Sequence, residues 1–250
     1  MTDLVFQLKD VAFSLRGNAG QVDVDLTGTI VTAGNSATGI FAQSAAGAAD
    51  GGHAGTAGNV NVTVNGSVLT GQVLVEEEDG TIEAPLRGLG STAIFAQSAA
   101  DNNAGNGNVV VAINGADAVV MGGRSNRINT DDGYVGVGVW IMDGKTNTVT
   151  NHGLITTVDG VDGGYSILAK GSDATHTGGD EAISIFGTVT GSFNPGAGSN
   201  SFTNEIDAVF NSGRFANVGT GRTLANAGWI SPGGARRVMT TDVTGIFSQA

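Results

Sequence analysis

The chain contains one seven-residue phrase twice. Ile-Phe-Ala-Gln-Ser-Ala-Ala occupies residues 40–46 and again residues 94–100, 54 positions later. Neither copy contains an acid or a histidine that could activate its serine, as a repeated catalytic site would. Because the repeat consists only of small, apolar and amide side chains, it indicates a repeated element of architecture.

A second repeated element is a valine-rich segment that opens with glycine, at residues 20–30, 58–68 and 107–117. Apolar residues occupy every second position in each copy, and most of them are β-branched, which favours an extended backbone. Each copy then reaches another glycine, preceded by asparagine in two of the three, which suits a turn. These segments are predicted strands with one buried face.

The two elements always follow each other in the same order, without reversal. A chain that winds around one axis produces such an order, because each coil lays its strands parallel to the coil beneath. We therefore predict an all-β fold, a single-stranded, right-handed parallel β-helix or solenoid. The valine-rich copies lie 38 and 49 residues apart, so the loops 45–59 and 75–90 are expected to vary at corners.

The pattern predicts one β-helix domain over residues 1–250. Residues 1–120 carry the regular repeats, whereas residues 121–250 carry degenerate rungs that end in Asn-Ala-Gly-Trp-Ile-Ser-Pro-Gly-Gly. Four segments in this second part put an aliphatic residue before a large one, at Trp140, Leu168, Phe210 and Phe247. We interpret these segments as further rungs. Residues 1–20 contain no evident cap for the first coil.

Composition excludes several classes of protein. Glycine is abundant, with 42 residues, but lacks the three-residue period of collagen, and 40% hydrophobic residues argue against a disordered linker. The formal charge of −12 would repel a phosphate backbone, so we expect no nucleic-acid partner. Cysteine is absent, which excludes disulfides and thiolate metal sites. No stretch has the length of a membrane-spanning helix, and Asp3 and Lys9 interrupt any signal peptide.

These repeats resemble the passenger regions of bacterial autotransporter proteins, the type V secretion group. The resemblance rests on the two Ile-Phe-Ala-Gln-Ser copies, on the valine-rich strands, and above all on the segment from Leu224 to Gly234. It implies a cell-surface or secreted location in a Gram-negative bacterium, with a signal sequence before the passenger and an outer-membrane β-barrel after it. Neither occurs in this chain, so we expect a piece of a longer protein or a truncated reading frame.

The best enzymatic candidates are Asp131 and Asp132, in an Asn-Thr-Asp-Asp-Gly stretch that resembles the motif of polygalacturonase-type β-helix hydrolases. Inverting hydrolysis needs two carboxyl groups with room for a water molecule between them. No second acidic pair or basic substrate clamp accompanies the stretch, and Asn, Asp and Gly are ordinary turn residues. The aspartates Asp159, Asp162, Asp173 and Asp180 lie near glycines but lack the calcium-binding nonapeptide. The histidines His53, His152 and His176 stand alone, so no metal or cofactor is predicted.

One feature favours binding. If Phe41, Phe95 and Trp140 stack on the outside, they form a stripe able to pack on glycan rings or on a partner's apolar surface. Strand parity alone leaves open whether the large rings face outward or inward. The leading hypothesis is a non-catalytic surface module, in which corner loops or this stripe contact a host or surface glycan or protein. The alternatives are a polysaccharide hydrolase or lyase using Asp131 and Asp132, and a fragment without independent function.

Overall fold

The structure is a computed structural model. It describes residues 7–9, 17–47, 55–71, 75–76, 82–83, 88–126, 135–174, 176–235 and 237–250. Helical structure in these ranges consists of two short 3₁₀ turns, η1 (Asn103–Gly105) and η2 (Gly160–Asp162), and strands make up the other regular elements. The predicted all-β class is confirmed. No helix in the described ranges has the length and hydrophobicity needed to cross a lipid bilayer.

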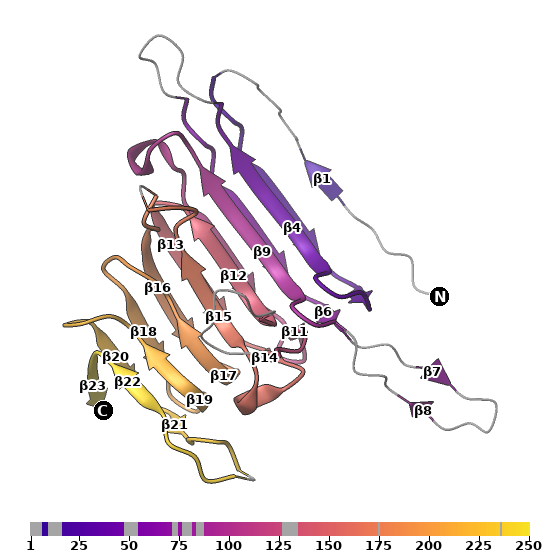
Figure 1. Cartoon of the computed structure of the whole chain (residues 1–250), viewed down its shortest axis with the longest axis vertical. Coiled ribbons are helices and arrows are strands. Elements are labelled where there is room, and N and C mark those ends of the chain that lie inside the picture. The colour runs from indigo at the N-terminus through magenta and orange to yellow at the C-terminus, as the bar shows by residue number, and fades with distance from the viewer. Residues whose placement is uncertain are drawn as a thin grey trace.

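Each coil begins on a first face, which contains the valine-rich strands (Figure 1). Its parallel strands are β2 (Val22–Leu26), β5 (Val60–Val64), β10 (Val109–Ile113), β13 (Thr146–Asn151), β16 (Asp180–Ile185), β18 (Ser201–Asn204), β20 (Thr223–Asn226) and β23 (Ile246–Gln249). The short strand β1 (Gln7–Lys9) lies antiparallel on the outer edge of β2. The backbone of this edge is therefore paired, although the sequence shows no evident cap.

The chain then crosses a second and a third face. The second face contains β3 (Thr29–Thr32), β6 (Ser67–Thr70), β11 (Val119–Gly122) and β14 (Leu154–Thr157). The third face contains β4 (Thr38–Ala45), β9 (Thr92–Ala99), β12 (Val137–Asp143) and β15 (Tyr165–Lys170). Two longer strands, β17 (Thr188–Asn194) and β19 (Val209–Asn217), run around the corner and pair on both faces. They are followed by β21 (Trp229–Ile230) on the second face and β22 (Asp242–Thr244) on the third.

The predicted parallel β-helix is confirmed. The strands of the described ranges form seven successive coils and the first strand of an eighth. A small antiparallel hairpin, β7 (Val75–Glu76) and β8 (Ile82–Glu83), interrupts the second coil between β6 and β9. In Figure 1 this hairpin stands away from the stacked strands. The strands before and after it, β6 and β9, keep their pairing with the neighbouring coils.

Coil length falls sharply along the solenoid. Equivalent positions on the first face lie 38, 49, 38 and 34 residues apart in the early coils, and 19, 22 and 23 residues apart in the later ones. The fifth and sixth coils are short because β17 and β19 turn the corner within a strand, where earlier coils insert a loop, and the seventh is short because a single residue separates β22 from β23. This change makes the sequence repeat difficult to follow from β16 onward.

The two copies of the seven-residue phrase lie directly on top of each other. β4 and β9 pair in parallel, with Ile40 beside Ile94, Phe41 beside Phe95 and each following residue beside its own copy. Ile40, Ala42 and Ser44 face the interior, and Phe41 and Gln43 face outward. The repeat exists because identical side chains stack well at a strand spacing of about 4.8 Å.

The serine of each copy clamps a corner of the coil. Ser44 Oγ donates to the carbonyl of Gly20 (2.8 Å) and accepts from the N–H of Gly58 (2.9 Å). Ser98 Oγ repeats the arrangement one coil later, with Gly58 and Gly107. Both serine side chains are buried, and each hydroxyl is satisfied by the partly buried glycine backbone of the corner. The serine is structural, and its repetition follows from the repetition of the corner.

We expect Ser98→Ala to lower the free energy of unfolding by about 1–3 kcal/mol, because the partly buried Gly107 N–H and Gly58 carbonyl would lose their partner. Urea denaturation followed by circular dichroism measures the change. Ser201→Ala, at an exposed position of β18, is the matched control and should change stability by less than about 0.5 kcal/mol. Equal losses in the two variants would contradict the clamp.

The residue types that fill the core change along the axis of the solenoid. Valine and isoleucine fill the early coils, whereas Phe193, Phe202 and Phe210 pack together in the shorter coils, with ring centroids 4.3–5.6 Å apart. The structure corrects the grouping of large residues made from the sequence. Trp140 and Leu168 share one outward column, but Phe210 faces inward on the second face and Phe247 belongs to the first.

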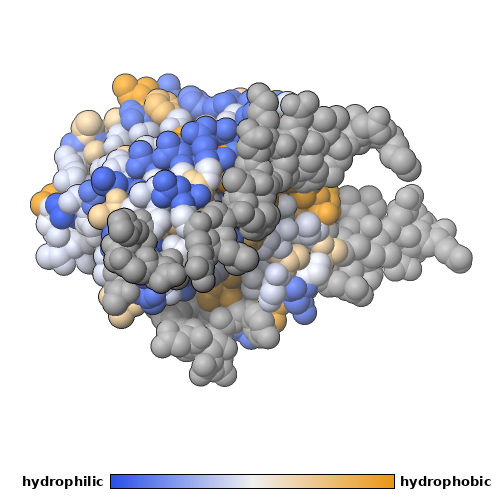
Figure 2. All heavy atoms as spheres, turned by 90° about the horizontal axis from the view of Figure 1, so that it is seen from above, coloured by the Kyte–Doolittle hydropathy of each residue, from blue (hydrophilic) through white to orange (hydrophobic). Residues whose placement is uncertain are grey.

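The outside of the solenoid is mostly polar. Figure 2 shows hydrophilic residues over much of the described surface in that view, with hydrophobic residues in scattered groups. Outward positions on the first face carry small or acidic side chains such as Asp23, Asn61 and Thr148. The third face differs, because three of its outward positions carry large aromatic rings.

Candidate functional site

A row of aromatic side chains crosses the third face. β4, β9 and β12 hold Phe41, Phe95 and Trp140 at equivalent positions. The ring centroids of Phe41 and Phe95 lie 5.0 Å apart, and those of Phe95 and Trp140 lie 5.6 Å apart. Phe41 is 62% exposed, and the other two rings are partly exposed. The three rings therefore face outward, which the sequence left open; we call them the aromatic stripe.

Ring orientation decides which aromatic surface a partner can reach. The planes of Phe41 and Phe95 differ by only 10°, and parallel rings at 5.0 Å must lie face over face, since rings side by side would overlap. Trp140 meets Phe95 nearly edge-on, at 76°, and Lys170 Nζ lies 4.8 Å from the centre of the Trp140 ring. Phe41 stands at the end of the row and is the ring with a face available to a partner.

A row of two amides, Gln43 and Gln97, accompanies the stripe, two residues beyond the ring on β4 and β9; the equivalent position on β12 is Met142. Gln43 Nε2 donates to Gln97 Oε1 (2.6 Å), and Gln97 Nε2 donates to Asp143 Oδ2 (2.7 Å). Asp143 Oδ1 accepts from the backbone N–H of Ser172 (2.8 Å). Gln97 and Asp143 are buried, whereas Gln43 is exposed. The Gln43 amide is therefore accessible at the same end of the face as the Phe41 ring.

A buried carboxyl group was missed by the sequence analysis. Glu181 on β16 is 2% exposed; its Oε1 accepts from Asn147 Nδ2 (2.8 Å) and its N–H donates to Asn200 Oδ1 (3.1 Å). Its Oε2 has no hydrogen-bond partner among the described residues. Burial raises the pKa of Glu181 to about 8; the Asn147 hydrogen bond opposes the rise, and the charge of Asp180 adds to it. The alternation of Glu181 with Ile183 and Ile185 could have revealed its inward position.

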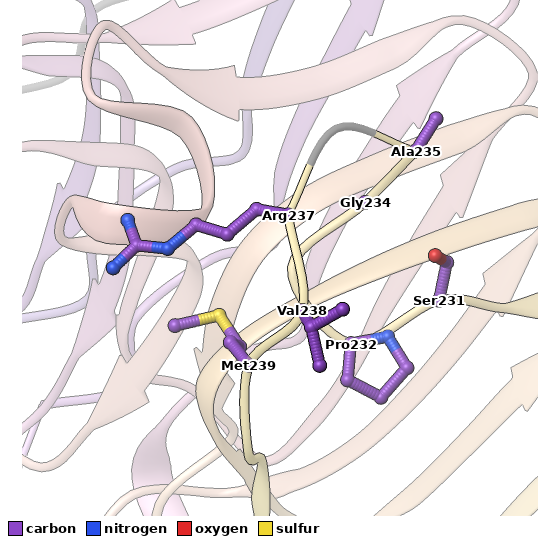
Figure 3. A pocket seen from close by; sticks show the side chains of 7 residues that line it. All are labelled: Ser231, Pro232, Gly234, Ala235, Arg237, Val238 and Met239. Atoms are coloured by element: carbon purple, nitrogen blue, oxygen red, sulfur yellow. The ribbon is translucent and has the colours of Figure 1, made fainter.

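The Leu224–Gly234 segment forms a corner rather than a reactive site. It leads into a hollow of about 500 Å³ (Figure 3), lined by Ser231, Pro232, Gly234, Ala235, Arg237, Val238 and Met239. Arg237 extends away from this hollow and pairs with Asp162 of η2. Gly233 and Gly234 have φ angles of +82° and +70°, which glycine adopts without strain. Among the described residues that line the hollow there is no histidine or carboxylate that could activate Ser231.

The two sequence candidates for hydrolysis, Asp131 and Asp132, lie outside the described residues. His53 lies outside them as well. The ring of His152 stacks on Phe186, with centroids 4.7 Å apart. His176 Nδ1 lies 2.9 Å from Asp173, and this hydrogen bond is the main cause that raises the pKa of His176. The structure does not bring these two histidines into one site.

The candidate calcium aspartates are engaged elsewhere. Asp159 accepts from Arg124 Nε (3.1 Å) and from the N–H of Ser125 (2.8 Å), and Asp180 accepts from the N–H of Ser199 (2.6 Å). Asp162 pairs with Arg237, and Asp173 with His176. Within the described ranges no three His, Cys, Asp or Glu side chains gather as they would around a metal ion.

Comparison of the chain with protein-family models, with curated proteins and with solved structures gives no match. The resemblance to autotransporter passenger regions is therefore carried by the sequence phrases alone. Among the described residues, the aromatic stripe with its amide row is the arrangement best suited to contact a partner.

Proposed function

We propose that this chain is a non-catalytic β-helical module of a bacterial cell-surface or secreted protein of the autotransporter type. Its role is to hold an outer surface in a rigid position and to present that surface to a host or neighbouring-cell partner. The single observation that supports this role best is the in-register stacking of seven coils, since parallel strands paired across three faces resist bending.

The arrangement of the side chains agrees with a role in presenting an outer surface to a partner. Several of the described side chains that could take part in catalysis are tied into corners or ion pairs, as Ser44, Ser98 and Asp159 illustrate. The aromatic stripe lies on the outer side of β4, β9 and β12, where a partner can approach from outside the solenoid. The sequence resemblance to passenger regions provides the cellular setting.

Surface labelling tests the proposal. Antibodies raised against the purified chain should label intact cells of the source organism, and protease added outside the cells should remove the signal. A cytoplasmic protein detected in the same samples serves as the control for cell integrity. Labelling that appears only after the envelope is permeabilised would overturn the proposed function.

A further inference from the structure

We propose that the Phe41 end of the aromatic stripe is a binding platform for a neutral glycan, with Gln43 as its polar contact. This inference rests on the proposed surface function and names the partner class for one of its faces. It is carried by the geometry of the stripe, by the amide row beside it and by the charge of the chain.

The ring provides the first part of the platform. Phe41 is 62% exposed and has Phe95 stacked against one face, so its other face can receive the C–H face of a sugar ring. The neighbouring ring holds Phe41 in place before a ligand arrives, which reduces the entropy lost on binding. Trp140 cannot serve in the same way, because Phe95 meets it on one side and Lys170 lies over its ring.

The amide provides the second part. Gln43 uses one Nε2 hydrogen for its bond to Gln97, which orients the group and leaves Oε1 and the second amide hydrogen for a ligand. A sugar has an apolar face and hydroxyl groups at its edge, and so matches a ring with an amide two residues away on the same strand face. An apolar protein segment would cover the Gln43 amide without replacing its hydrogen bonds to water, which is unfavourable.

Charge distinguishes between classes of glycan. The chain carries a formal charge of −12, which disfavours uronic acids, sialic acids and sulfated sugars. The residues that form the platform, Phe41 and Gln43 with Phe95 behind them, are uncharged. The nearest cation of the stripe, Lys170, is engaged with Trp140 two strands away from Phe41. A neutral glycan is therefore the ligand that the platform fits.

Isothermal titration of the purified 250-residue chain tests the inference, with cellohexaose, mannohexaose and N-acetylchitohexaose as neutral probes and oligogalacturonate as the anionic probe. We expect weak binding of at least one neutral probe. Phe41→Ala should lower its affinity about tenfold, as expected for loss of one stacking contact, and Phe41→Trp should preserve it. Gln43→Ala should lower affinity about threefold. Phe186→Ala, at an exposed phenylalanine beside His152, is the matched control and should bind like the original chain.

Three results would overturn the inference: no binding of any neutral probe at millimolar concentration, binding that Phe41→Ala leaves unchanged, or binding of the anionic probe alone. Circular dichroism of each variant distinguishes loss of the platform from loss of the fold. Failure here is distinguishable from failure of the proposed function, because surface labelling of intact cells does not depend on any glycan. If the protein is labelled at the cell surface but binds no neutral probe, the proposed function stands and the proposed glycan site is rejected.

Discussion

Replacing Glu181 with glutamine is expected to stabilise the protein by about 3–5 kcal/mol at pH 8 and to leave its stability nearly unchanged at pH 4. The folded state raises the pKa of this carboxyl from 4.5 to about 8, chiefly through burial. Below pH 4.5 both folded and unfolded chains hold the proton. As the pH rises from there to about 8, the unfolded chain releases its proton while the folded chain retains it, so stability is lost over this window.

Urea denaturation at several pH values measures this effect as the difference between the two proteins. The original chain should lose stability relative to Glu181→Gln between about pH 4.5 and pH 8, and the difference should then level off. Glu205→Gln, at a partly exposed position between β18 and β19, is the control for losing one carboxyl group and should change stability at pH 8 by less than about 0.5 kcal/mol. A pH-independent difference between the original chain and Glu181→Gln would contradict a buried, protonated Glu181.

Phe202→Ala is expected to lower the free energy of unfolding by about 3–5 kcal/mol, because it opens a cavity in the short coils. Phe202 is fully buried, with ring centroids 4.3 Å from Phe193 and 5.2 Å from Phe210. These coils contain about half as many residues as the early ones, and three large rings fill their interior. Few other side chains are available there to close the space left by the lost ring.

Phe41→Ala removes the same atoms from the outside and is the matched control. It loses one stacked neighbour and little buried area, so its cost should stay below about 1.5 kcal/mol. Thermal and urea denaturation of both variants provide the comparison. A loss in Phe41→Ala as large as that in Phe202→Ala would mean that the aromatic stripe supports the fold rather than faces a partner.

The two pairs of repeated residues illustrate different reasons for repetition. Ser44 and Ser98 recur because each closes the same corner against glycine backbone, a requirement internal to the coil. Phe41 and Phe95 recur on the outer side of the same strands, where the core does not require them. A pattern repeated on the outside forms a continuous surface, and this surface is the basis of the proposed glycan platform.

Much of this protein was determined by local pattern in the sequence. Alternation of apolar residues identified the valine-rich strands, their unreversed order indicated parallel coils, and the repeated phrase indicated a repeated element of architecture. These predictions succeeded because strand parity and a repeated turn are properties of neighbouring residues, and because stacked coils place equal positions in equal environments.

Tertiary structure alone decided the rest. Local pattern could not show that β17 and β19 run around a corner, that Phe210 points inward, or that Glu181 lies beneath Asn147, since each depends on which coil lies above and below. The same holds for the aromatic stripe: parity groups the rings on one side, but only the stacked neighbours determine that Phe41 keeps a face open while Lys170 covers Trp140. Contacts between coils such as Glu181 with Asn200 and Gln43 with Gln97 join residues 19 and 54 positions apart, and a short sequence window contains no information about those partners.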